Sequence, residues 1–343
     1  MARIVIADSS LAFDGRTPEQ RPSGGAESAV VSLANAFARA DHAVSVHNRC
    51  ETPVRHRDVD WVPLANGLPA EADFYIANRS HFLIGAMPAA RRKVFWIHNP
   101  ARYLLKARYL WPLWRVRPAI VFSGASHAAT YPAWAPAGRR VIIPLGIDDM
   151  FRSANERAAP PARAIFTSNP QRGLAWLLRL WRERIRPAVP QGELHVFSGA
   201  AVYGGDANPK AAAMAAIIDE ARAMAPDGVV LRAPVARAAL VDEITASRVM
   251  LYRGDEGETF SLALAEAQAL GVPCVVQPIA AVPERIRDGE TGHVAVTEQD
   301  FAAAAIRLLT DDAHWDRQHR AALAHQRSFG WDEAAAAWAG AFL

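Results

Sequence analysis

Two glutamates eight residues apart, Glu258 and Glu266, flank the beginning of an alanine-rich apolar run. A helix rises about 1.5 Å per residue, so acids at this spacing lie roughly 12 Å apart along the axis if the run from Ser261 is helical. Carboxylates accept hydrogen bonds from hydroxyl groups, and the free N–H groups of a helix start attract phosphates. The segment therefore suits a ligand with hydroxyl groups on both sides of a diphosphate, as in a nucleotide sugar.

An ordinary structural role is the alternative for both acids, because charged side chains are usually exposed and acids favour helix starts. The residues around Glu266 argue against it. Leu264, Ala265 and Ala267 are apolar or small, so this helix is expected to be buried on more than one side. A carboxylate in such a helix needs a polar partner.

The run from Asp255 to Val276 resembles the donor-site signature of the retaining nucleotide-sugar glycosyltransferases of family 4, which have the GT-B fold. The resemblance implies that Glu258 contacts the transferred sugar and Glu266 holds the ribose. Further family-like segments occur in the right order along most of the chain: Ser23–Glu27, Trp96–Pro100, Pro144–Asp148 with Phe151, Gln171–Leu174 and Phe329–Trp331. Each segment is weak alone, and their order carries the resemblance. It also implies donor contacts from Thr259, Phe260, Ser261 and Leu262.

Two further site candidates lie in the first half of the chain. His98 follows the apolar run Val94–Ile97, and the family has a histidine at this strand end in contact with the transferred sugar. Gly24 and Gly25 precede a helix expected over Glu27–Ala40, and the family's glycine loop lines the donor phosphate and acceptor side. Without the resemblance, a glycine pair indicates a turn and a histidine at a strand end is structural about half the time.

Arg172 is the candidate cation for the diphosphate. It precedes Gly173 at an expected helix start, where a guanidinium stabilises the charge on a departing diphosphate. The chain departs from the family here, because relatives carry an arginine just after the strand and a lysine just before the glycine. Arg172 takes the lysine's place, whereas Thr167, Ser168 and Asn169 occupy the arginine's neighbourhood. One of the two phosphate-binding cations is therefore either missing or supplied from elsewhere in the chain.

The nucleobase leaves little trace in the sequence. The resemblance implies backbone contacts near Ala233–Val235, so Val235 is a donor-site candidate, and Asn169 is another in the turn before Arg172. Backbone contacts do not distinguish uracil, guanine and adenine.

The order of the apolar runs predicts an α/β protein. Short runs alternate with helical stretches, which is typical of parallel sheets covered on both faces. The polar, proline-containing segment 153–163 is the expected linker. We expect a GT-B fold of two doubly wound Rossmann-like domains facing a central cleft. The expected parts are residues 1–152 on the acceptor side, 164–325 on the donor side, and a terminal helix in 326–343 that packs back on the first domain.

Composition narrows the protein class. The chain has 343 residues, 51% of them apolar, and only Cys50 and Cys274, without the spacing of a zinc site or a disulfide framework. The apolar run near Met1 is too short for a signal peptide or a membrane span, so we expect a cytoplasmic protein.

Charge is distributed unevenly. Residues 1–150 hold 18 Lys and Arg against 12 Asp and Glu, and residues 151–343 hold 20 against 23. A basic and aromatic segment over 102–117 includes Arg108, Trp111, Trp114 and Arg115. Such a segment can contact an anionic membrane or a lipid diphosphate; a helix with a packed aromatic stripe is the alternative. We expect no nucleic-acid partner, since no recognised motif accompanies the charge.

These features predict a retaining hexosyltransferase that uses a UDP- or GDP-sugar and a hydroxyl of a glycan or glycolipid acceptor in surface polysaccharide biosynthesis. We expect no metal and no other cofactor, with Arg172 and helix N–H groups in the place of a cation. The alternative is a non-catalytic nucleotide-sugar sensor or scaffold with the same fold, because one cation is missing. A nicotinamide enzyme would need the G-x-G-x-x-G fingerprint, which is absent.

Overall fold

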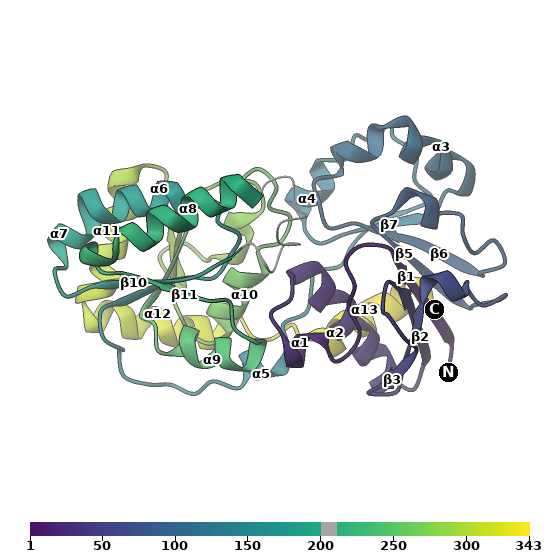
Figure 1. Ribbon diagram of the computed structural model, residues 1–343, viewed down its shortest axis with the longest axis horizontal. Helices are drawn as coiled ribbons and strands as arrows, with labels where there is room; N and C mark the ends of the chain where they lie inside the picture. Colours follow the sequence, from purple (N-terminus) through teal and green to yellow (C-terminus); the bar gives the residue numbers. More distant parts are fainter. Residues whose placement is uncertain (200–210) are drawn as a thin grey trace. The chain divides into compact units, whose positions relative to one another are not determined.

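A computed structural model describes residues 1–199 and 211–343. The chain forms two compact units, one of Met1–Gly146 with Phe329–Leu343 and the other of Ile147–Ser328. Each unit has its own parallel sheet with helices on both faces (Figure 1). The predicted α/β class with two Rossmann-like domains is confirmed. The segment 153–163, expected to be a linker, lies in the second unit, which begins at Ile147.

The first unit contains an eight-stranded sheet in the order β3-β4-β2-β1-β5-β6-β7-β8. Its strands are β1 (Arg3–Asp8), β2 (Ala43–Asn48), β3 (Val54–His56), β4 (Val59–Pro63), β5 (Phe74–Asn78), β6 (Arg92–Trp96), β7 (Ala119–Phe122) and β8 (Arg140–Ile142). All neighbours pair in parallel except β3, which is antiparallel to β4 at the edge. The central strand β5 is buried along its whole length, as a sheet covered on both faces requires.

Helices of the first unit come from both ends of the chain. They are α1 (Thr17–Gln20), α2 (Gly25–Arg39), α3 (Ala107–Val116), α4 (Ala125–Ala129) and α13 (Trp331–Phe342), with short turns η1 (Leu64–Asn66), η2 (His81–Leu83) and η3 (Ala101–Leu105). The C-terminal helix α13 lies beside α2 (Figure 1). Arg39 and Asp332 form an ion pair of 2.5 Å between them, and the Phe342 ring stacks on Phe74 of the sheet at 5.4 Å. The C-terminal segment is thus an integral part of this unit.

The second unit contains a six-stranded, fully parallel sheet in the order β11-β10-β9-β12-β13-β14. Its strands are β9 (Arg163–Phe166), β10 (Glu193–Phe197), β11 (Val229–Arg232), β12 (Val249–Tyr252), β13 (Cys274–Val276) and β14 (Gly292–Val294). Its helices are α5 (Asp149–Arg152), α6 (Leu174–Leu180), α7 (Arg186–Ala188), α8 (Ala211–Ala223), α9 (Arg237–Thr245), α10 (Leu262–Ala269), α11 (Glu298–Thr310) and α12 (Asp312–His325), with short segments η4 (Trp181–Ile185), η7 (Ala225–Asp227) and η8 (Val282–Arg285).

Polar side chains follow the carboxyl ends of neighbouring strands in both sheets. In the first unit Asp8 and Asn78 end the paired strands β1 and β5, and His98 comes shortly after β6. In the second unit Tyr252 ends β12, and Arg172 closes the loop after β9. Carboxyl ends of parallel strands meet at one edge of a sheet, where α/β proteins bind ligands. In the described part of the chain, no helix has both the length and the apolar character needed to cross a bilayer.

Candidate functional site

Glu258 is the centre of a buried polar cluster in the second unit. Its side chain is 1% exposed and forms an ion pair with Arg172. The same oxygen, Oε1, accepts a hydrogen bond from the Tyr252 hydroxyl, and Oε2 accepts one from Ser261 Oγ at 2.9 Å. The cluster joins the ends of β9 and β12 to the start of α10. Since a carboxylate offers about four acceptor positions, Glu258 can still accept a ligand hydroxyl.

The helix expected from Ser261 begins at Leu262, so Glu258 lies in the loop before α10 and Glu266 lies inside the helix. The separation of roughly 12 Å applied the helical rise to the whole segment between the two acids, whereas only the part from Leu262 onward is helical. Ser261 breaks the helical path, because its backbone has φ 64° and ψ 64°, a left-handed conformation.

Strain at Ser261 serves the geometry of the cluster. A residue other than glycine in this conformation costs of order 1 kcal/mol and persists where its surroundings enforce it, often at functional sites. Here the Ser261 side chain does not cap α10 and instead donates to Glu258. Leu264 and Ala265 donate their N–H groups to the Ser261 carbonyl oxygen at 3.1 and 3.2 Å, whereas the N–H groups of Leu262 and Ala263, at the first two positions of α10, have no intrahelical acceptor. Glu258 is thus fixed next to a helix end suited to an anion.

The loop after β9 presents Arg172 to Glu258. Asn169 shapes this loop by accepting a hydrogen bond on its Oδ1 from the Gln171 N–H at 2.9 Å. Gly173 then adopts φ 89°, which favours glycine, and a Cβ there would lie 2.6 Å from Cβ of Arg253. Burial alone would lower the pKa of Arg172, but Tyr252 and Glu258 raise it above its usual range. Arg172 is therefore a fixed cation at the start of α6.

Thr167 and Ser168 stand where relatives carry a second cation, and two other arginines lie near this cluster. The Arg285 guanidinium lies 4.3 Å from the centre of the Phe260 ring. Arg253 follows β12 and donates a hydrogen bond to Gln277 Oε1 at 3.1 Å. Both side chains are half-buried. Arg253 and Arg285 therefore add positive charge to that of Arg172 in the loop after β9.

Glu266 has the polar partner that its apolar helix demands. It is 4% exposed, and its Oε1 accepts a hydrogen bond from Arg237 Nη2 at 2.6 Å. The same nitrogen donates to Asp148 Oδ2 at 2.5 Å. Burial raises the pKa of Glu266, Arg237 lowers it, and the nearby Asp148 raises it. The expectation that Glu266 is buried and partnered is confirmed.

The remaining donor-site candidates of the second unit occupy neighbouring loops. Thr259 and Phe260 are buried between Glu258 and Ser261, and Leu262 is half-buried at the first position of α10. Val235 is half-buried in the loop between β11 and α9, two residues before Arg237. Their assignment to a donor stays a prediction.

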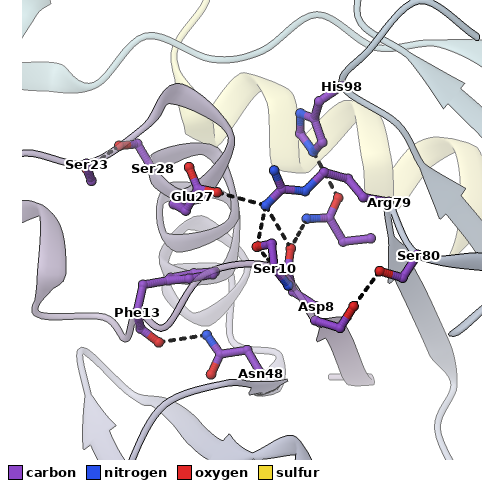
Figure 2. Close-up of polar contacts among 12 residues, drawn as sticks. Asp8, Ser10, Phe13, Ser23, Glu27, Ser28, Asn48, Arg79, Ser80 and His98 are labelled. Atoms are coloured by element: carbon purple, nitrogen blue, oxygen red, sulfur yellow. Dashed lines mark hydrogen bonds and ion pairs between the residues drawn. The ribbon is translucent and has the colours of Figure 1, made fainter. Parts of the chain in front are cut away.

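A second polar cluster lies at the carboxyl edge of the first unit's sheet (Figure 2). Arg79, with φ 62° just after β5, donates hydrogen bonds from Nη2 to Ser10 Oγ at 2.6 Å, Glu27 Oε1 at 2.9 Å and Asp8 Oδ2 at 3.2 Å. Asn78 donates from Nδ2 to the same Asp8 oxygen. Asp8 is fully buried. Asp8 and Glu27 both pair with Arg79, so this cluster holds two carboxylates around one guanidinium.

His98 joins this cluster through Asn78. Its Nε2 lies 2.9 Å from Asn78 Oδ1, which can only accept, so the Nε2–H donates. Burial lowers the pKa of His98 well below its usual range, and Arg79 and His127 lower it further. His98 is therefore neutral at neutral pH. Gly24 is the residue before α2 and Gly25 its first residue, so the helix begins two residues earlier than expected.

Several residues of these clusters had no predicted role: Asp8, Asn78, Arg79, Asp148, Arg237 and Tyr252. A usable signal existed for four of them. Asp8, Asn78, Arg79 and Tyr252 end or directly follow a strand, which is the criterion that selected His98. Arg237 had no such signal, since it is an ordinary first-turn residue until folding brings it to Glu266.

Comparison with known proteins adds a family for the second unit. Residues 163–311 match the model of the family described as glycosyl transferases group 1. The D-inositol 3-phosphate glycosyltransferase of Streptomyces scabiei is 40% identical over 117 residues, which are 33% of this chain and 26% of that protein. The matched part spans between about a quarter and a half of the length of the first curated relatives.

Solved structures show the fold of the whole chain. Sucrose-phosphate synthase from Thermosynechococcus elongatus superimposes with a TM-score of 0.77 at 16% identity, covering 99% of this chain and 98% of that one. Anabaena HepE, solved in complex with UDP and glucose, gives 0.73 at 14% identity, covering 99% of both chains. The two units therefore have the fold of GT-B glycosyltransferases, and residues 163–311 match the glycosyl transferases group 1 family.

Proposed function

We propose that this protein is a retaining glycosyltransferase of family 4 that moves a hexose from a UDP- or GDP-sugar to a hydroxyl of a glycan or glycolipid. The observation that carries the proposal is the ion pair between buried Glu258 and half-buried Arg172, just before the starts of α10 and α6. This pair lies inside the segment that matches the glycosyl transferases group 1 family. The HepE structure, bound to UDP and glucose, supports a nucleotide-sugar donor.

Each charged group has a place in the proposed reaction. Arg172 and the free N–H groups of the first turn of α10 hold the diphosphate. Glu258 accepts hydroxyl groups of the sugar, and Glu266 accepts those of the ribose. The bond between the sugar C1 and the diphosphate oxygen breaks, and the acceptor oxygen bonds to C1 on the same face. The acceptor proton passes to the departing phosphate oxygen, so the reaction needs no protein nucleophile and no metal.

In the non-catalytic alternative, the protein has the same fold and binds the donor but does not transfer the sugar. It is favoured by Thr167, Ser168 and Asn169 in the loop where relatives carry a second cation. The nearby Arg253 and Arg285 weaken this alternative, because they supply positive charge from other loops. We further propose a role in surface polysaccharide biosynthesis at the cytoplasmic face of a membrane.

A thermal-shift panel of UDP, GDP, ADP and their sugars tests donor binding. Ligands that bind only the folded protein raise its melting temperature in proportion to the logarithm of their excess over Kd. We expect one nucleoside diphosphate and its sugar to stabilise the protein by several degrees, with the other bases giving smaller shifts. If no compound in the panel shifts the melting temperature, the proposed function is wrong.

Helix α3 supports the proposed contact with an anionic membrane. Tyr109 and Leu113 bury one side of the helix, whereas Trp111 and Trp114 are 64% and 61% exposed, with rings stacked at 5.5 Å. The aromatic side chains of α3 are therefore not all packed in the core. Between Asp73 and Asp148 the chain has eleven Lys and Arg and no acidic residue. Exposed indoles on a segment rich in Lys and Arg suit the interface of anionic lipids.

We expect the protein to float with vesicles of phosphatidylglycerol and phosphatidylcholine at low salt, and to dissociate at about 0.5 M salt because the charges are screened. Replacing Trp111 and Trp114 together by Ser should lower the bound fraction severalfold. Trp134→Ser is the matched control, since Trp134 is 73% exposed outside α3. Equal flotation of the double variant and wild type would exclude α3 as the contact.

A further inference from the structure

In the second unit, buried Arg237 connects the proposed ribose acid, Glu266, to half-buried Asp148. Arg237, the first residue of α9, is 9% exposed and donates from one nitrogen to Glu266 and to Asp148. Its guanidinium carbon lies 4.9 Å from the centre of the Phe151 ring in α5. Two segments distant in sequence, Asp148–Phe151 and Glu266 in α10, therefore fix the position of this guanidinium.

This arrangement has a cost that packing alone does not explain. Burying the Arg237 guanidinium and the Glu266 carboxylate is unfavourable, and apolar residues of similar volume often stabilise a protein as well or better.

The two oxygens of Glu266 are not equivalent. Oε1 is held by Arg237, whereas none of the described residues donates a hydrogen bond to Oε2. Oε2 is not fully enclosed by the described residues, so it retains some accessible surface. A carboxylate with one oxygen fixed and the other accessible is oriented to accept from a ligand.

We propose that Arg237 is a positioning residue for the donor, which holds Oε1 of Glu266 and leaves its Oε2 to the ribose hydroxyls. The inference rests on the proposed function, since it takes Glu266 as the ribose acid. Arg237 also directly follows the loop 233–236, where the nucleobase is expected, so one side chain connects the base loop to the ribose acid. Asp148 and Phe151 hold Arg237 in turn.

The electrostatics give this role a signature that a purely structural role lacks. Burial and Asp148 raise the pKa of Glu266, and Arg237 opposes both. Without Arg237, the folded protein should favour protonated Glu266 to a higher pH. A protonated carboxyl is a weaker acceptor for hydroxyl groups, so binding of the ribose should weaken more at pH 6 than at pH 8.

The experiment compares UDP, GDP and ADP with their 2′,3′-dideoxy counterparts by calorimetry. Wild type should prefer the ribonucleotide of its own base by about tenfold or more, from hydrogen bonds to a charged acceptor. Arg237→Gln should bring this preference close to one, with a larger loss at pH 6 than at pH 8. Arg237→Lys, which keeps the charge without the planar fork, should retain part of it.

A matched control and a positive control make the result decisive. Arg163→Gln breaks the pair between Arg163 and Glu243 of the same helix α9, at the amino end of β9, and should keep the wild-type preference. Glu266→Gln should lose the preference. If Glu266→Gln loses it and Arg237→Gln keeps it at both pH values, the inference about Arg237 fails and the proposed function stands. If wild type binds none of the nucleotides, the proposed function itself fails. If Arg237→Gln does not fold, the preference of Arg237→Lys for the ribonucleotide is compared with that of wild type at both pH values instead.

Discussion

Replacing Glu258 by Gln is expected to lower the rate of sugar transfer by about a hundredfold or more. The carboxylate is the common acceptor for Arg172, Tyr252 and Ser261, so it fixes the cation and the start of α10 together. Gln keeps the shape and one acceptor oxygen but removes the charge that holds Arg172. Slow hydrolysis of the donor should fall in parallel, because it uses the same charged groups without an acceptor.

Glu243→Gln is the matched control for this substitution. Glu243 also pairs with a half-buried arginine of the same sheet, Arg163, but at the amino end of β9. It should keep wild-type turnover with a similar change in melting temperature. Circular dichroism of both variants separates loss of chemistry from loss of folding. Unchanged turnover in folded Glu258→Gln would contradict the assignment of Glu258.

Replacing Arg172 by Met is expected to reduce transfer by about a hundredfold to a thousandfold, the range for removal of one group that stabilises developing charge. The departing diphosphate gains negative charge as the glycosidic bond breaks, so the effect should be larger on kcat than on donor KM. Affinity for the nucleoside without phosphates should stay unchanged. Steady-state kinetics with the donor and calorimetry with the nucleoside measure the two effects.

The lysine variant of Arg172 tests whether charge or shape matters. Arg172→Lys keeps the cation but loses the planar fork, so it should recover part of the lost rate. Arg253→Met is a useful comparison, since Arg253 lies beside Gly173 without contacting Glu258 in the described structure. A full rate in Arg172→Met would show that the phosphates are held elsewhere, with Arg285 as the next candidate.

The fold was predictable because its signals are local. Buried parallel strands such as Phe74–Asn78 appear as apolar runs, and α2 and α8 follow the helical stretches between them. Elements with weak local patterns were missed. Helix α12 is polar, with three histidines and two arginines, and β14 has only three residues. Their burial comes from tertiary contacts, such as the hydrogen bond that His319 Nδ1–H donates to the Gly271 carbonyl oxygen at 2.6 Å.

The candidate site was predictable in its parts and not in its connections. The apolar surroundings of Glu266 indicated a polar partner, but nothing in the sequence identified Arg237, 29 residues away along the chain. The resemblance supplied the segment ending in Asp148 without a role for it. Likewise His98 followed from its strand end, whereas the contacts of Arg79 with Asp8 and Glu27 depend on how the chain folds.

The most direct measurement of the central claim is hydrolysis of the nucleotide sugar that gives the largest thermal shift, with the released sugar followed by NMR from the first minutes. Our account predicts release of the nucleoside diphosphate together with a sugar that initially has the anomeric configuration of the donor, and loss of both in Glu258→Gln. Binding of the donor without any release, with or without added hydroxyl acceptors, would contradict a transferase and favour the sensor. Initial release of the opposite anomer would contradict the retaining mechanism.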